Sequence, residues 1–244
     1  DSPVIPVVIS KAEKMTSGVT KYEFSRPDGL DLPPLTAGAH IDVVVAPEFF
    51  RQYSLSGNPA DRSTYQIAVL REDEGRGGSK LMHRIFEEGR KVFISHPINH
   101  FPLATNAGKS ILMGGGIGIT PMIAMAHELH AAGRDFALHY SGRSRTTMGY
   151  LTALAQVPWA DKLHLHITDE GTRCHMSQAV VYTPDAHIYT CGADGYMTSV
   201  LAAATAAGVP EEAQHLEYFS VPELPAFENH AFTIKLASSG QTLT

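Results

Sequence analysis

The stretch LMGGGIGITPM, residues 112 to 122, decides the fold of the second half of this 244-residue chain. A short apolar run leads into glycines at positions 114, 115, 116 and 118, and a helical pattern follows. The usual dinucleotide fingerprint, G-x-G-x-x-G, does not fit, because its third glycine would fall on Ile119 or Pro121. The stretch is therefore either a tight strand-to-helix turn without a ligand or a phosphate-binding turn of another design.

The residues around this turn alternate between strand and helix patterns from about residue 105 onward. Such alternation is typical of a parallel sheet that is covered by helices on both faces. Ligands of open parallel sheets bind outside the carboxyl ends of the strands, which is where the glycine turn lies. Strands are predicted at 110–113, 136–141, 162–167, 187–191 and 213–219, and helices at 120–132, 148–157 and 195–208.

The first hundred residues have a different pattern, with short β-branched or aromatic runs between clusters of Gly, Pro and Asp. This pattern predicts an antiparallel β-barrel or sandwich with one helix, near 79–88. The predicted strands are 4–10, 19–25, 40–46, 51–57, 65–71 and 91–97. We therefore expect a β-barrel at 1–104, an α/β domain at 105–219, a Pro-rich linker at 220–230 and the start of a further domain at 231–244.

Composition limits the possible partners. The net charge of -6 argues against a nucleic-acid binder, because such proteins concentrate basic residues on one face. No apolar run is long enough for a membrane span. Two cysteines make no disulfide framework, so the cytoplasm is the expected location.

Each half carries a glycine turn before a predicted helix, and helix N-termini favour anions. In the second half the backbone amides of the glycine turn could reach a phosphate, and Pro121 suits the first helical turn. In the first half, Gly77, Gly78 and Ser79 precede the single helix, and Arg51 in RQYSL could bind phosphate with its guanidinium fork. Arg143 and Arg145 in SGRSR could pair with a pyrophosphate or a 2'-phosphate, although a solvated charged loop is equally compatible.

Cysteine and histidine patterns give weaker signals. Cys174 fits a small buried hydrophobe, whereas Cys191 stands at a strand end beside Gly192. The histidines in HELH (127–130) and LHLH (163–166) do not have the order of a zinc-protease motif, and solvated surface explains them better. We therefore predict no metal site.

Five motifs stand in the order and approximate spacing of one family: RQYSLSGNP, GRGGS, GGGIGITPM, YTCGADGYM and HLEYF. Together they resemble the ferredoxin-NADP reductase superfamily, and most of all its phthalate dioxygenase reductase branch, over residues 3 to 244. The resemblance implies a flavin-binding barrel, a nicotinamide-binding α/β domain and, in that branch, a C-terminal [2Fe-2S] domain. The glycine turn would then be a phosphate turn whose last positions also reach the flavin.

The resemblance also implies site residues, and it places Ser54, Thr120 and Cys191 nearest to the reacting rings. The flavin set is Arg51, Gln52, Tyr53, Ser54, Val69, Leu70, Arg71, Gly77, Gly78, Ser79, Thr120 and Phe219. The nicotinamide cofactor set is Gly115, Gly116, Gly118, Pro121, Arg143, Ser144, Cys191, Gly192, Asp194 and Met197.

The implied activity is hydride transfer from NADH, with NADPH possible, to FMN, followed by single-electron transfer to an iron-sulfur centre. The acceptor would be a ferredoxin domain or the oxygenase component of a Rieske-type aromatic oxygenase or demethylase. One alternative is an FAD-dependent ferredoxin-NADP reductase that serves a separate ferredoxin. Another is a non-enzymatic flavin or nucleotide sensor.

The last fourteen residues, AFTIKLASSGQTLT, resemble the first hairpin of a plant-type ferredoxin. Such a cluster needs four cysteines in the pattern C-x4-C-x2-C and a distant C, which this chain lacks. We therefore expect [2Fe-2S] only in a longer natural form. Phe232, Ile234 and Leu236 would lack a sheet to cover them, and we expect them to be disordered or packed on the other domains.

Overall fold

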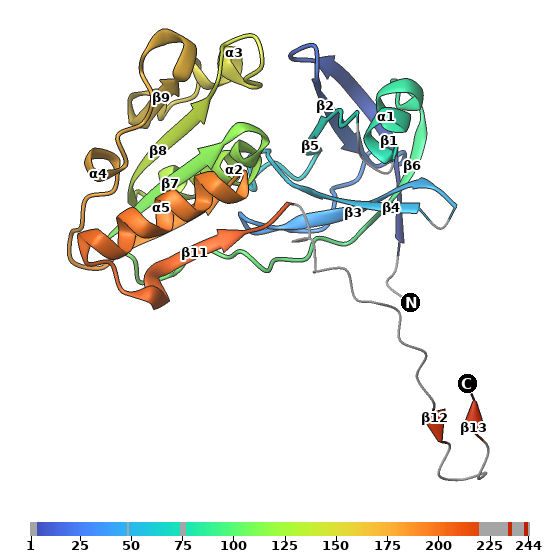
Figure 1. The fold of residues 1–244 in the computed structure, drawn as a ribbon. Helices are drawn as coiled ribbons and strands as arrows, with labels where there is room; N and C mark the ends of the chain where they lie inside the picture. The colour runs from blue at the N-terminus through green and yellow to red at the C-terminus, as the bar shows by residue number, and fades with distance from the viewer. Residues whose placement is uncertain (1–3, 48, 74–76, 220–233, 236–241, 244) are drawn as a thin grey trace.

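The computed structural model describes residues 4–47, 49–73, 77–219, 234–235 and 242–243. Figure 1 shows two domains side by side, an antiparallel barrel built from the N-terminal strands and a parallel sheet with helices. The predicted fold class is confirmed.

The barrel consists of six antiparallel strands in the order β4-β3-β6-β1-β2-β5. Apolar residues alternate along the strands, and in the first strand Ile5, Val7 and Ile9 point into the core. Helix α1 (Gly78–Ile85) packs on this core through Met82. The strands are β1 (Val4–Lys14), β2 (Val19–Ser25), β3 (His40–Ala46), β4 (Phe49–Ser54), β5 (Tyr65–Leu70) and β6 (Lys91–Ser95).

The barrel is nearly closed, because its two edge strands meet at one end only. Just beyond β4, the amide of Ser56 donates to the carbonyl oxygen of Gln66 on β5, at 2.9 Å. Strands β4 and β5 are otherwise the unpaired edges of the sheet. Their residues 51–54, 68 and 70 line a hollow between them.

The second domain is a five-stranded parallel sheet in the order β11-β10-β7-β8-β9. Its central strand is buried on both faces: Leu112 packs with α2, and Ile111 and Met113 pack with α5. This double burial explains the continuous apolar run before the glycine turn. The elements are β7 (Lys109–Gly115), η1 (Gly116–Gly118), α2 (Ile119–Ala131), β8 (Asp135–Gly142), α3 (Leu151–Leu154), η2 (Ala160–Lys162), β9 (Leu163–Ile167), η3 (Thr168–Glu170), α4 (Met176–Ala179), β10 (Ala186–Cys191), α5 (Asp194–Ala207), η4 (Glu211–Ala213) and β11 (Gln214–Glu217).

The helix predicted at 148–157 forms only one turn, Leu151–Leu154. Tyr150 precedes it with φ of 67°, a left-handed conformation that no helix interior adopts. Buried Tyr150 is instead held by its contact with the barrel: its hydroxyl lies 2.6 Å from the Ser56 hydroxyl. Tertiary contact therefore overrides the local helical pattern.

The two domains share one apolar core. Val19, Ala37, Ala68 and Phe101 of the barrel belong to the same buried cluster as Leu112 and Ile119 of the sheet domain. Hydrogen bonds cross the same boundary, for example from the amide of Ala37 to the Glu128 carboxylate, at 3.2 Å. The barrel and the sheet domain are therefore firmly packed against each other.

The predicted linker 220–230 lies outside the described residues, as do Phe232, Leu236 and the side chain of Ile234. The described tail residues form one antiparallel pair, β12 (Ile234–Lys235) with β13 (Thr242–Leu243). In the part of the chain that the structure describes, no helix combines the length and apolar character needed to cross a membrane.

Candidate active site

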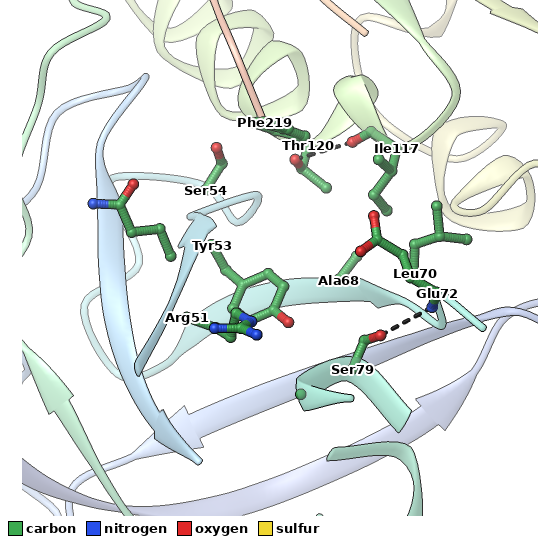
Figure 2. Close-up of a pocket in the computed structure, with 12 residues that line it drawn as sticks. Arg51, Tyr53, Ser54, Ala68, Leu70, Glu72, Ser79, Ile117, Thr120 and Phe219 are labelled. Carbon is green, nitrogen blue, oxygen red and sulfur yellow. Dashed lines mark hydrogen bonds between the residues drawn. The ribbon is translucent and has the colours of Figure 1, made fainter. Parts of the chain in front are cut away.

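Two adjoining hollows lie where the barrel meets the sheet domain. The smaller, of about 140 Å³, opens between β4, β5 and α1, and Ile117, Thr120 and Phe219 cover it from the sheet domain (Figure 2). The larger, of about 720 Å³, lies along the carboxyl ends of the parallel strands. Four residues line both hollows: Leu70, Glu72, Ile117 and Phe219.

Strand β4 supplies four consecutive residues to the wall of the smaller hollow: Arg51, Gln52, Tyr53 and Ser54. The Arg51 guanidinium lies over the Phe49 ring, 4.1 Å from its centroid, and donates to the Phe50 carbonyl oxygen at 3.0 Å. The Tyr53 hydroxyl donates to the Met82 sulfur at 3.3 Å, which fixes its ring on α1. This edge strand thus presents a cation, a ring and a hydroxyl to one space.

The first turn of α1 closes one end of the smaller hollow. A Cβ at Gly78 would lie 2.6 Å from the Phe49 ring and 2.9 Å from Arg51 Nε, so a larger residue there would displace both side chains. The Ser79 hydroxyl accepts the Glu72 amide at 2.9 Å (Figure 2). Gly77 precedes the helix, and among the described residues no side chain caps the first-turn amides, which face the side on which an anion could bind beside Arg51. These groups fit a phosphate.

Ser54 and Glu217 join the two domains inside the site. The Ser54 hydroxyl donates to Glu217 Oε1 at 3.1 Å, and Glu217 pairs in register with Cys191 on the neighbouring strand. Burial raises the pKa of Glu217, although the Ser54 hydrogen bond opposes this effect. Burial, and secondarily the Glu217 charge, raises the pKa of Cys191, whose thiol is therefore neutral at ordinary pH.

Glu217 is absent from the residues predicted from the sequence. Its only signal is an acid among apolar and aromatic residues in HLEYF, at the end of a strand. The sequence alone could not show that this strand ends beside Ser54, because 163 positions separate the two residues.

The glycine turn runs against the end of β10. A Cβ at Gly118 would lie 2.2 Å from the Cys191 carbonyl oxygen, so a side chain here would drive the turn away from the strand. Gly115, Gly116 and Gly192 line the larger hollow. Gly118, Pro121 and Cys191 are buried behind this wall and do not line it.

Other predicted nucleotide residues divide between the wall and its surroundings. Arg143 lines the larger hollow, whereas Ser144 lies outside it and bonds to the Thr146 hydroxyl at 2.8 Å. Asp194 is exposed at the start of α5, and Met197 is buried. Residues that we did not predict also line the hollow: Ser141, His166, Thr168, Arg173, Cys174, Met176, Ala193, Gly195, Tyr196 and Ser199.

The buried hydroxyls of Ser141 and Tyr196 lie close to each other, but neither makes a hydrogen bond of regular geometry among the described residues. Both line the larger hollow, where a polar ligand could satisfy them. With Arg143 and the turn amides they fit a phosphate-bearing nucleotide.

Two predicted flavin residues point elsewhere. On β5, Ala68 and Leu70 line the smaller hollow, so the strand alternation turns Val69 into the barrel core. The Arg71 side chain is exposed and pairs with Asp73 at 3.3 Å. Neither side chain therefore lines the smaller hollow.

The expected contrast between the cysteines is reversed. Cys191, not Cys174, is the fully buried one, while Cys174 is half-buried on the wall of the larger hollow. The histidine prediction is partly wrong as well: His164 is exposed, but His166 is half-buried and its Nε2 lies 2.8 Å from Nδ1 of buried His139. Burial lowers the pKa of His139 to about 3 and lowers that of His166.

Comparison with known proteins returned no matching family model. The chain is 37% identical to a vanillate O-demethylase oxidoreductase of Pseudomonas sp. (strain HR199 / DSM 7063) over 98% of this chain and 77% of that protein. It is 34% identical to a carnitine monooxygenase reductase subunit of Escherichia coli (strain K12), over 99% of this chain and 75% of that protein. A solved phthalate dioxygenase reductase, described as a modular structure for electron transfer from pyridine nucleotides to [2Fe-2S], superposes with a TM-score of 0.84 at 34% identity, over 98% of this chain and 75% of that one.

Proposed function

The chain belongs to the phthalate dioxygenase reductase family, the oxidoreductases that pass electrons from a pyridine nucleotide through flavin to an iron-sulfur partner in oxygenase systems, and we propose that it does so with FMN and NADH. The smaller hollow would hold the flavin and the larger one the nicotinamide cofactor. The observation that carries this proposal is the shared wall between the two hollows, formed by Leu70, Glu72, Ile117 and Phe219. Two flat ligands that meet at this wall would be stacked for direct transfer.

A bound flavin supplies the ability to accept a hydride and to release electrons one at a time. The protein's part is to hold both ligands in place. Ser54 and Glu217 join the barrel to the end of β11, and Cys191 supports the end of β10 from behind the wall. Phe219, whose side chain is 43% exposed, lines both hollows and would shield the flavin ring from water until the nucleotide arrives.

FMN is favoured over FAD by the end of the smaller hollow. Arg51 and the uncapped first turn of α1 together suit a phosphate that ends its molecule. Mass spectrometry of the flavin released on denaturation tests this directly. We expect the mass of FMN, and release of FAD would contradict the choice and favour a reductase that serves a separate ferredoxin.

NADH is favoured over NADPH by the state of one arginine. Arg145 forms a two-pronged pair with Glu170 and is therefore engaged. Arg143 and Arg173 line the larger hollow, and Glu72 is the one acid among the described residues that line it. We expect a higher kcat/KM with NADH. Glu170→Gln, which releases Arg145, should raise kcat/KM for NADPH more than for NADH. A wild-type preference for NADPH would contradict this choice.

The electron acceptor is proposed to be a [2Fe-2S] centre, in a ferredoxin domain of a longer form or in an oxygenase component for an aromatic compound. We propose the cytoplasm as location, since reduced nucleotide is supplied there and both cysteines are free thiols. Oxidation of NADH with an artificial one-electron acceptor would separate this enzyme from a non-enzymatic sensor. A 244-residue protein that supports oxygenase turnover as fast as any longer form would contradict a need for the further domain.

A further inference from the structure

Three metal-ligating side chains converge at one edge of the larger hollow. They are His139 on β8, His166 on the neighbouring strand β9, and Cys174 in the segment after η3. The potential ligand atoms all lie within 4.8 Å of one another, and the two imidazole nitrogens that face each other are 2.8 Å apart. His166 and Cys174 also line the hollow itself.

The backbone holds this arrangement in place. After β9 the chain turns through η3, and Thr172 returns to Ile167: its amide donates to the Ile167 carbonyl oxygen at 3.1 Å, and its hydroxyl accepts the Ile167 amide at 2.9 Å. These two bonds close the loop one residue beyond His166 and two residues before Cys174. The turn thereby brings the Cys174 thiol back beside β9, the strand that carries His166.

We propose that His139, His166 and Cys174 form a binding site for a borderline transition metal ion such as Zn²⁺, with one coordination position directed to the larger hollow. Two imidazoles and one thiolate are ligands that Zn²⁺ prefers. Tetrahedral bonds of about 2.0–2.1 Å to nitrogen and about 2.3 Å to sulfur place ligand atoms roughly 3.3–3.6 Å apart. The observed separations are 2.8 Å between the two imidazole nitrogens and no more than 4.8 Å within the whole group, so the side chains would adjust around a bound ion.

The protons of the three ligands can be accounted for. Nδ1 of His139 and Nε2 of His166 form one hydrogen bond, so one of these two nitrogens carries the proton and the other accepts it. A metal ion needs a free lone pair on both nitrogens, so this proton must move to the other nitrogen of its own ring. Cys174 must release its thiol proton to solvent.

Metal binding has a consequence for the neighbouring ligand, which rests on the proposed function. His166 and Cys174 lie on the wall that would hold the nicotinamide cofactor. An ion held there would occupy part of that space. We therefore infer that Zn²⁺ inhibits NADH oxidation competitively with NADH.

Direct metal binding is the first test, because it does not depend on activity. The flavin-loaded protein, reduced with a phosphine rather than a thiol, would be titrated with Co²⁺ and then Zn²⁺. We expect one equivalent of Co²⁺ to give a thiolate-to-cobalt charge-transfer band, which Zn²⁺ abolishes. Cys174→Ser should remove the band, and His166→Gln should weaken affinity by about tenfold or more.

A second histidine pair in the same sheet provides a matched control. Nδ1 of His187 lies 2.9 Å from Nε2 of His215, and the two rings are stacked. Among the described residues, this pair does not belong to a group of three potential metal ligands. His187→Gln should leave the stoichiometry, the band and Zn²⁺ inhibition unchanged. If His187→Gln abolishes binding, or Cys174→Ser retains it, the assignment is wrong.

The two proposals fail in different ways. If the band appears and depends on Cys174 but NADH is not oxidised, the metal site stands and the proposed function falls. If NADH is oxidised but no Cys174-dependent band or Zn²⁺ equivalent is found, the metal site falls alone. Zn²⁺ inhibition that persists in Cys174→Ser would show that inhibition arises elsewhere.

Discussion

The Glu217 carboxyl lies inside the protein, with the Ser54 hydroxyl as its hydrogen-bond donor. Burial raises its pKa above the ordinary value of 4.5, so ionisation costs more free energy in the folded than in the unfolded state. Its contribution to stability is therefore fully present below about pH 4.5 and is lost as the pH rises through the folded pKa. An amide at this position would avoid that loss.

We accordingly predict that Glu217→Gln raises the melting temperature at neutral pH and has little effect near pH 4. Thermal unfolding of both proteins across this pH range gives the difference between their melting temperatures. The other carboxyls titrate alike in both proteins, so their effect cancels in this difference. A difference that is independent of pH would mean that Glu217 has the same pKa in the folded and unfolded states, and would contradict the prediction. Activity should fall in the same variant if the carboxyl also positions Ser54.

Cys191 is buried between the glycine turn and Glu217 and carries a neutral thiol. If this thiol positions the end of β10 for the nicotinamide, Cys191→Ala should slow flavin reduction by about tenfold, equivalent to about 1.4 kcal/mol of barrier. Rapid mixing with NADH gives this rate, and its dependence on NADH concentration gives the affinity. We expect affinity to change less than rate. Equal reduction rates would assign Cys191 to packing.

At the scale of elements, the junction of β4 and α1 binds the phosphate in our proposal. Arg51→Ala should weaken flavin retention by about 1.5–3 kcal/mol, the range for a hydrogen bond to a charged group. Arg71→Ala is the matched control, because Arg71 is exposed and paired with Asp73 instead. Flavin absorbance after repeated dilution and filtration reports retention. Equal losses from both variants would remove Arg51 from the site.

The contact between the glycine turn and β10 gives a second prediction at this scale. Gly118→Ala should destabilise the protein by roughly 1–3 kcal/mol and raise KM for NADH, because the added Cβ meets the Cys191 backbone. Gly18→Ala is the control, since its Cβ would lie 3.7 Å from Leu70 and should change stability by less than about 0.5 kcal/mol. Denaturant unfolding and steady-state kinetics measure both quantities. A Gly118→Ala protein with wild-type stability and KM would show that the turn moves freely.

Across the whole molecule, the sequence predicted what periodicity and glycine spacing control. The strands at 19–25 and 40–46 agree with the structure at both ends, and the helix predicted at 195–208 ends at Gly208, which is left-handed with φ of 95°. The one-turn α4 has no comparable periodic signal and was not predicted.

The parts that the sequence could not predict depend on contacts between distant positions. Glu217 reaches Ser54 only because the two domains pack together. His139, His166 and Cys174 meet because β8 and β9 are neighbours in register and the loop after β9 turns back. A single sequence without this register shows two unrelated histidines and a cysteine.

The apolar cluster that Val19, Ala37, Ala68 and Phe101 share with Leu112 and Ile119 also bears on how such proteins can be recombined. A gene break between codons 104 and 105 would leave each half with part of that shared core exposed to water, and exposed apolar patches of this kind promote aggregation. Exchange of one half for that of a distant relative would demand matched side chains on both sides of the boundary. The two domains should therefore be kept together when such genes are recombined. Successful gene fusions should join new partners before residue 4 or after residue 219.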